Sequence, residues 1–184
     1  CDSDHRDASP GTPRAEGATK LPDRFEIGVV ATSAEIDRWN IDVMPDGEGL
    51  PAGRGSVEAG RRLYAKRCQH CHGSEGAGRP FDRLAGRQPG DDFPFAENPG
   101  APRTIGSYWP FATTLFDYTR RAMPSDRPGS LSDQEVYDVT AYLLFLNGLL
   151  EEPAVLDRST LVGIVMPARD RFFRDDRRGG PEIR

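Results

Sequence analysis

The chain has 184 residues, a formal net charge of −5, 36% apolar residues, and 20 glycines and 16 prolines. This length allows one domain with extensions or two very small domains, and the glycine and proline content predicts much loop and extended chain. No apolar run approaches the roughly 18 residues that a membrane-spanning helix needs, and no part of the chain is basic enough to support nucleic-acid binding.

The N-terminal part divides into two predicted segments. Residues 1–22 are small, polar and rich in Pro and Gly, which predicts a flexible tether. Residues 23–55 are predicted to form a wrapping arm, with the apolar stretch FEIGVV followed by a helical turn in SAEIDRW that Ser33 could cap. The net negative charge belongs to these segments, because the chain up to Arg54 has eleven acidic and six basic residues, whereas from Val57 onward there are eighteen of each.

A cysteine is the first residue of the chain, Cys1. A cysteine at this place before a polar tether resembles the start of a mature bacterial lipoprotein, from which a signal peptide has been removed. We therefore expect Cys1 to be lipidated, and the protein to be held at a membrane outside the cytoplasm, on the periplasmic or cell-surface side. The alternative is a chain boundary that happens to fall on a cysteine.

The first two of three predicted helices lie in the middle of the chain, within residues 56–150. Ser56 is a good N-cap, and the sequence VEAGRRLYAKRC that follows it predicts a helix. A second helix is predicted from Pro110 to Ala122, because proline suits the first turn and the next proline, Pro124, disfavours helix in the residue before it.

The third predicted helix follows Ser132, in SDQEVYDVTAYLLFLNG. Ser132 and Glu135 have the spacing of a capping box, and Asn147-Gly148 is a fitting helix end. The sequence shows no strand pattern of any length and no internal repeat. We therefore predict an all-α domain over 56–150.

The sequence RCQHCHG contains the spacing C-x-x-C-H, formed by Cys68, Cys71 and His72. This spacing is typical of covalent haem attachment, in which two thiols add to the haem vinyl groups and the histidine that follows supplies an axial nitrogen. A redox dithiol, half of a zinc site and coincidence are the alternatives. A redox dithiol favours a βαβ setting and zinc needs two further ligands, and the sequence indicates neither.

Each of the three methionines precedes a proline, and one of them is expected to be the sixth iron ligand. Thioether sulfur is a soft ligand that raises the reduction potential of haem iron. Met123 lies between the second and third predicted helices, where a loop can close over the haem. Met44 and Met166 are expected to fill the core, which is the commoner place for a methionine.

The sequences GRRLYAKRCQHCHG and VYDVTAYLLFLNG, with the Met-Pro loop between them, resemble a class I cytochrome c domain. This resemblance implies three main helices around one covalent haem c, with extended N- and C-terminal arms in this chain. It also implies a close crossing of the first and last helices, for which Gly60 and Tyr142 are suited. A main-chain carbonyl after the motif is expected to orient the axial histidine, and Pro80 is the residue predicted to provide it.

The flanking sequences MPDGEGLPAGRG and TIGSYWPFATTLFDYTRRAMP resemble the cytochrome subunits of molybdenum sulfite dehydrogenases and sulfane dehydrogenase complexes. The resemblance implies an electron-transfer subunit rather than an enzyme, which receives electrons from a molybdenum-containing dehydrogenase subunit or another redox protein and passes them to the respiratory chain. The alternatives are a free-standing membrane-anchored shuttle, and a haem enzyme or gas sensor if the sixth site is open.

The stretch TIGSYWPF has a composition suited to the haem edge. Tyr108 and Trp109 are expected either to bond the haem propionates through their polar atoms or to pack the core, and Arg103 is expected to offset the propionate charge.

The C-terminal extension, 151–184, contains the apolar run LVGIVM and the arginine-rich DRFFRDDRR. We expect residues 161–166 to pack on the haem domain, and residues 172–178 to meet the partner, since aromatic and arginine side chains are typical interface anchors.

Overall fold

The computed structural model describes residues 27–173, which group into two compact units that divide between Trp39 and Asn40. Cys1, the predicted tether and residues 174–184 lie outside the described part of the chain, so the predictions made for them are not examined by the structure. In the described range, no helix combines the length and the apolar character that crossing a membrane requires.

The described part of the smaller unit contains one short helix, α1 (Ser33–Trp39). This helix was predicted, but Ser33 is not its cap. Thr32 has that role: its hydroxyl accepts from the backbone N–H of Glu35 at 3.3 Å, and the Glu35 carboxylate accepts from the backbone N–H of Thr32 at 2.8 Å. Every residue of α1 is exposed.

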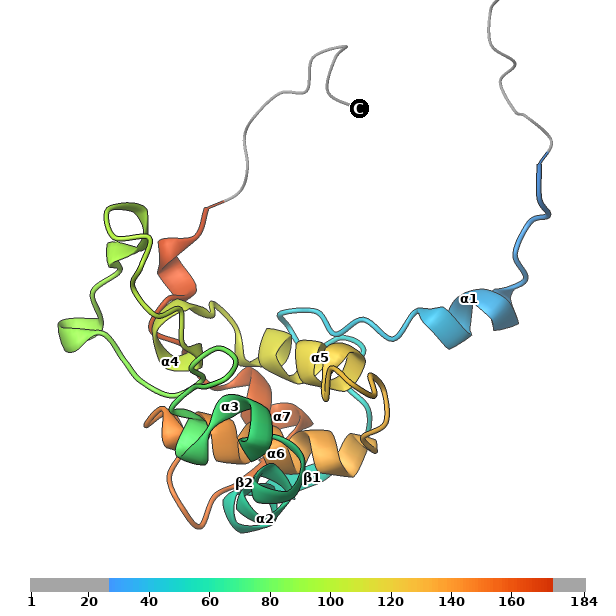
Figure 1. Ribbon diagram of the computed structural model, residues 1–184. Helices are drawn as coiled ribbons and strands as arrows, with labels where there is room; N and C mark the ends of the chain where they lie inside the picture. The colour runs from blue at the N-terminus through green and yellow to red at the C-terminus, as the bar shows by residue number, and fades with distance from the viewer. Residues whose placement is uncertain (1–26, 174–184) are drawn as a thin grey trace, which may run out of the picture. The chain divides into compact units, whose positions relative to one another are not determined.

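Three helices make the core of the larger unit, α2 (Val57–Arg67), α5 (Ala112–Ala122) and α6 (Asp133–Leu146), as Figure 1 shows. Two of them begin where the sequence predicted. The Ser56 hydroxyl accepts from the backbone N–H of Ala59 at the start of α2, and Ser132 and Glu135 form the predicted capping box of α6. The second helix starts two residues later than predicted, at Ala112, and ends as predicted before Met123.

The close crossing of α2 and α6 is confirmed. A Cβ atom on Gly60 would lie 1.9 Å from the carbonyl oxygen of Asp138 and 2.7 Å from the Cβ atom of Tyr142, so only glycine lets the two backbones approach this closely. The rings of Tyr64 and Tyr142 pack beside this crossing with their centroids 5.4 Å apart.

A two-stranded antiparallel sheet, which the sequence did not predict, lies against α6. It pairs β1 (Arg54–Ser56) with β2 (Val155–Asp157), and Gly55 faces Leu156 in the register. The strands are held next to α6 because the Asp138 carboxylate accepts from the backbone N–H of Ser56 at 3.0 Å. The larger unit is therefore mostly helical, as predicted, with this small sheet beside its helices.

The C-terminal extension packs on the larger unit as predicted for residues 161–166. After β2 comes α7 (Arg158–Val162), and Leu161, Met166 and Ala168 are buried. Asp157 caps α7, and the backbone N–H of Thr160 first, then the Ser159 hydroxyl, lower the pKa of its carboxyl from 3.8 to about 2. Met166 is thus the core-filling methionine that we expected.

Residues 40–55 also pack within the larger unit. Val43 and Leu50 are buried, and the Asp117 carboxylate on α5 accepts from the backbone N–H of Val43 at 3.1 Å. Met44, however, is 50% exposed, so the prediction that it fills the core is wrong. Its neighbour Val43 takes the buried place instead.

The remaining elements are short and carry the loops around the site. They are α3 (Gln69–His72), α4 (Ile105–Tyr108), and the 3₁₀ turns η1 (Ser74–Gly76), η2 (Pro89–Asp91), η3 (Pro94–Ala96) and η4 (Arg169–Arg171).

Candidate functional site

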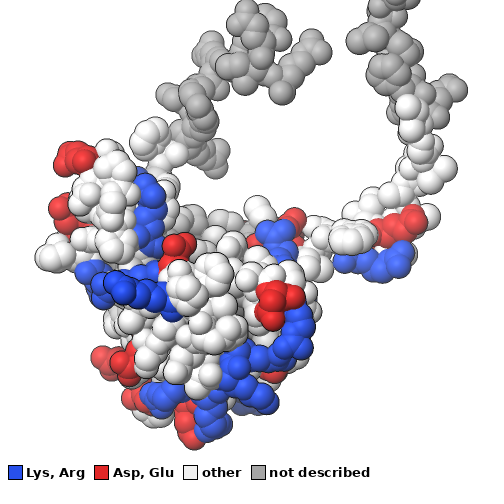
Figure 2. Space-filling model, viewed as in Figure 1, with Lys and Arg blue, Asp and Glu red and all other residues white. Residues whose placement is uncertain are grey.

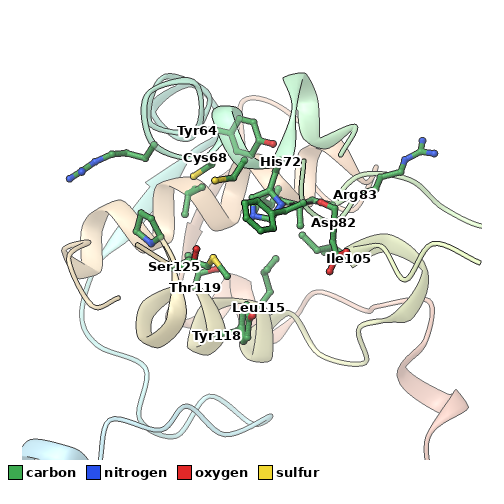
Figure 3. Close-up of a pocket in the computed structure, with 18 of the residues that line it drawn as sticks. Tyr64, Cys68, His72, Asp82, Arg83, Ile105, Leu115, Tyr118, Thr119 and Ser125 are labelled. Carbon is green, nitrogen blue, oxygen red and sulfur yellow. Dashed lines mark hydrogen bonds between the residues drawn. The ribbon is translucent and has the colours of Figure 1, made fainter. Parts of the chain in front are cut away.

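A cavity of about 360 Å³ lies between α2 and α3 on one side and α5 with its following loop on the other. In Figure 3, Cys68 and His72 approach it from one side, whereas Leu115, Tyr118 and Thr119 approach it from the opposite side. Most of its wall is apolar, and these wall residues include Leu84, Ile105, Leu115, Leu131, Val139 and Leu143. The cavity is thus a mostly apolar slot with sulfur and nitrogen groups of the motif in its wall.

The two cysteines of the motif lie where α2 ends. Cys68 is the C-cap of α2, and its backbone N–H donates to the carbonyl oxygen of Tyr64 at 2.8 Å. The short helix α3 then carries Cys71 and His72 onto the same cavity. The two thiols are half-buried and not joined to each other, and burial, followed by the nearby Cys71, raises the pKa of the Cys68 thiol to about 11. Both sulfur atoms are therefore available to a group bound in the cavity.

The imidazole of His72 is held by one hydrogen bond. Its Nδ1 lies 2.9 Å from the carbonyl oxygen of Asp82. Because a carbonyl oxygen can only accept, Nδ1 carries the proton and Nε2 keeps its lone pair, which suits it to bind iron. The prediction that Pro80 provides this carbonyl is wrong, because the carbonyl oxygen that meets the ring belongs to Asp82.

A buried asparagine fixes the loop that contains Asp82. Asn147, at the end of α6, accepts through Oδ1 from the backbone N–H groups of Gly86 and Gly106, at 2.9 and 3.0 Å. Its Nδ2 donates to the carbonyl oxygens of Leu84 and Leu143, at 3.3 and 2.8 Å. The sequence indicated Asn147 only as a helix end, and its position after the last buried turn of α6 was the available signal.

Met123 lies on the opposite side of the cavity from the motif. It is the C-cap of α5, where its backbone N–H donates to the carbonyl oxygen of Thr119 at 3.2 Å, and it is half-buried in the cavity wall. The structure therefore places it with Cys68, Cys71 and His72, although its binding to iron stays a prediction.

The three residues predicted at the haem edge separate in the structure. Arg103 and Trp109 line the cavity, and the Trp109 ring packs against Tyr118 with centroids 5.5 Å apart. Tyr108 does not line the cavity, but stacks on Phe93 with centroids 5.7 Å apart. Of the two alternatives for Tyr108, the structure thus favours packing over a direct contact with the propionates.

The residues around the cavity fit a covalently attached haem. Two free thiols and a ring nitrogen with an oriented lone pair face a thioether across an apolar slot, and such a donor set suits haem iron. Arg67, Arg83 and Arg103 also belong to the cavity wall and could balance two carboxylates at its rim. Of these, Arg83 already donates through Nε to the carbonyl oxygen of Ala85 at 2.7 Å.

Comparisons with known proteins agree with this geometry. Residues 55–143 match the family model described as cytochrome c oxidase, cbb3-type, subunit III. A chain in the crystal structure of the sulfane dehydrogenase SoxCD from Paracoccus pantotrophus is 37% identical, with a TM-score of 0.71, over 83% of this chain and 73% of that one.

A curated relative is the thiosulfate dehydrogenase of Psychrobacter arcticus, which is 31% identical over 110 residues. The match covers 56% of this chain and 31% of the relative, so the chain spans about a third of that protein's length.

Proposed function

The chain belongs to the cytochrome c family, and we propose that it is the electron-accepting subunit of a molybdenum-containing dehydrogenase that oxidises a sulfur compound. Its relatives are thiosulfate and sulfane dehydrogenase proteins, it carries haem c, and electron transfer is its function. The predicted class I cytochrome c fold is confirmed. The observation that carries the proposal is the cavity that brings the C-x-x-C-H motif and Met123 together, in a chain 37% identical to a chain of sulfane dehydrogenase SoxCD.

The roles proposed for the chain's own residues follow from the cavity. Haem c, when bound, supplies one-electron chemistry at iron. Cys68 and Cys71 would hold it through thioether bonds, and His72 Nε2 would bind its iron, with the ring direction set by the Asp82 carbonyl. Met123 would bind the iron through its thioether sulfur. With the iron held by these two residues, substrate would have no place at it, which suits an electron carrier rather than a catalyst.

The proposed donor is the molybdenum-containing subunit and the proposed acceptor is the respiratory chain. Support for the donor comes from the similarity to sulfane dehydrogenase SoxCD, which covers most of both chains. We further propose that the protein works outside the cytoplasmic membrane, anchored through lipid on Cys1, with the polar stretch of about 20 residues after it as a tether.

Reduction kinetics test this function. The holoprotein is mixed with its co-purified dehydrogenase subunit, sulfite or thiosulfate is added, and the haem absorbance is followed in a stopped-flow instrument. We expect the haem to become reduced only when both the dehydrogenase and a sulfur substrate are present. Haem that stays oxidised while the dehydrogenase turns over with an artificial acceptor would contradict the proposal. The lipid anchor is tested by mass analysis of the N-terminal peptide of natively expressed protein. An unmodified Cys1 thiol in that peptide would contradict the anchor.

A second candidate function is direct oxidation of thiosulfate by this chain. It is suggested by the similarity to the thiosulfate dehydrogenase of Psychrobacter arcticus. Reduction of the isolated holoprotein by thiosulfate alone would support it. A free-standing shuttle is a further alternative, and failure to co-purify with any molybdenum subunit would favour it.

A further inference from the structure

Four aromatic rings form a cluster beside the cavity, and one of them comes from the C-terminal extension. Phe172 packs edge-on against Phe93 and Tyr108, with ring centroids 5.6 and 5.5 Å apart. Phe95 packs edge-on against the same two rings, at 4.8 and 5.0 Å. Phe172 thus packs on its own domain, and the contact of residues 172–178 with a partner stays a prediction.

Arg103 lies over this cluster and faces the cavity. The Cζ atom of its guanidinium is 5.3 Å from the Tyr108 centroid and 5.9 Å from the Phe95 centroid, within cation–π range. Arg103 also belongs to the cavity wall. Within residues 27–173 it makes no ion pair and no hydrogen bond, so its donors are free for an anion in the cavity. Figure 2 shows basic side chains gathered where the loop of residues 86–101 meets the body of the larger unit.

The extension is fastened at this place by a second contact. Arg171 donates to the carbonyl oxygen of Asp91 at 3.4 Å, and Asp91 itself pairs with Arg87, whose Nε lies 2.9 Å from the carboxylate. The next residue after Phe172 behaves differently, since Phe173 is 91% exposed and Phe172 44%. Of these two adjacent phenylalanines, only Phe172 belongs to the aromatic cluster.

We propose that Phe172 is a positioning residue for the haem site: together with Tyr108 and Phe95 it holds the Arg103 guanidinium toward the haem propionates. The proposal rests on the haem binding in the proposed function, but not on the identity of the partner. Tyr108 and Phe95 make the surface on which the guanidinium lies, and Phe172 packs edge-on against Tyr108. Without Phe172, Tyr108 gains freedom to turn and Arg103 loses its fixed direction.

A fixed cation at the propionates has a measurable effect on the iron. Reduction adds one negative charge to the haem, so a nearby positive charge favours the reduced state and raises the reduction potential. Replacing Arg103 by Gln should lower the equilibrium constant for haem reduction about tenfold, which is about 59 mV for a one-electron couple. Replacing Phe172 by Ala should give a smaller fall, of about threefold, because the charge remains but moves toward water.

The test is a double-mutant cycle on the full-length holoprotein, with the potential measured by spectroelectrochemistry. The variants are Phe172→Ala, Arg103→Gln and the double variant, with Phe173→Ala as the matched control and Phe172→Tyr as the conservative replacement. We expect Phe172→Ala to lower the potential in the presence of Arg103 and to have no effect in the Arg103→Gln background. Phe173→Ala and Phe172→Tyr should keep the wild-type potential. The cycle distinguishes an effect that acts through Arg103 from a general loosening of the fold, because loosening would shift the reduction potential in both backgrounds.

Two results would overturn the proposal. One is an equal shift for Phe172→Ala in both backgrounds, and the other is no shift for Phe172→Ala relative to Phe173→Ala. Failure of the proposed function is a separate outcome: a pyridine haemochrome spectrum without thioether-bound haem would show it before any potential is measured. The potential needs neither the dehydrogenase nor its substrate, so a wrong partner leaves this test intact.

Discussion

Replacing Gly60 by Ala should destabilise the protein, although the same change normally stabilises a helix. In an exposed helix Ala is favoured over Gly by about 1 kcal/mol. At Gly60 the new Cβ would lie 1.9 Å from the Asp138 carbonyl oxygen, whereas real Cβ atoms essentially never approach closer than 3.0 Å, so α2 and α6 must separate by about 1.1 Å (3.0 − 1.9). The atom in the way is main chain and cannot rotate aside.

Separating the two helices would lower the free energy of unfolding, because it weakens the contacts beside the crossing. It would stretch the hydrogen bond from the Ser56 N–H to the Asp138 carboxylate and loosen the packing of Tyr64 on Tyr142. Overpacking a core costs about 1–3 kcal/mol, and we expect about 3 kcal/mol here. With a urea slope of about 2 kcal/mol per molar, the unfolding midpoint should fall by about 1.5 M.

Urea unfolding followed by circular dichroism measures this, with Gly100→Ala as the control. A Cβ atom on Gly100 would meet only the Asn98 side chain, at 3.5 Å, and its φ is ordinary, so this change should leave the midpoint unchanged or raise it slightly. If Gly60→Ala is as stable as the wild type, the close crossing of α2 and α6 is not what holds these helices in place.

Three other changes test separate parts of the fold. Asn147→Ala removes the acceptor of the Gly86 and Gly106 N–H groups and should cost about 2–5 kcal/mol in the free energy of unfolding; a cost below about 1 kcal/mol would contradict the role of this residue in fixing the loop. The Asp157 carboxyl has its pKa lowered from 3.8 to about 2, so its stabilisation is complete above pH 3.8 and is lost as the pH falls toward 2. Asp157→Asn should therefore flatten the pH dependence of stability in that window, and an unchanged acid profile would refute this cause. Thr140→Val should raise stability by about 1 kcal/mol in thermal unfolding, because the buried hydroxyl finds no hydrogen-bond partner among residues 27–173; a lower melting temperature would indicate a hidden partner.

The helices could be predicted because their starts have local causes. A serine followed by an apolar run, and a glutamate three residues after a serine, act within one turn of the chain. Ser56, Ser132 and Glu135 have in the structure the contacts that this spacing requires. The same reasoning was off by one residue in the arm, where Thr32 and Ser33 are both good caps and only the bonding to Glu35 distinguishes them.

The sheet could not be predicted, because its stability comes from distant residues. Three residues on each strand give too short a stretch to show alternation. The two strands, residues 54–56 and 155–157, pair beside α6. There the Asp138 carboxylate accepts a hydrogen bond from the backbone N–H of Ser56, which lies 82 residues earlier in the chain. The helix α6 is buried on several faces, since Val136, Tyr137, Val139 and Leu144 are all buried.

The site was predictable where it depends on residue type and unpredictable where it depends on main chain. Two thiols and an imidazole at fixed spacing can be read from the sequence, and the structure gathers them on one cavity with Met123. The carbonyl that orients the His72 ring belongs to Asp82. Because every residue has a main-chain carbonyl, the residue that provides this one cannot be identified from the sequence. The aromatic cluster of Phe172 depends in the same way on two segments about 70 residues apart.

The coordination state of the iron tests the central claim most directly, which is that this chain carries electrons and leaves no open site for substrate. The measurement is the ferric spectrum and the carbon monoxide binding of the reduced holoprotein, for the wild type, Met123→Ala and Met44→Ala. We predict a low-spin wild type that does not bind carbon monoxide, a Met123→Ala variant that becomes high-spin and binds it, and a Met44→Ala variant that behaves like the wild type. A wild type that binds carbon monoxide, or a Met123→Ala variant that stays low-spin and inert, would contradict the account.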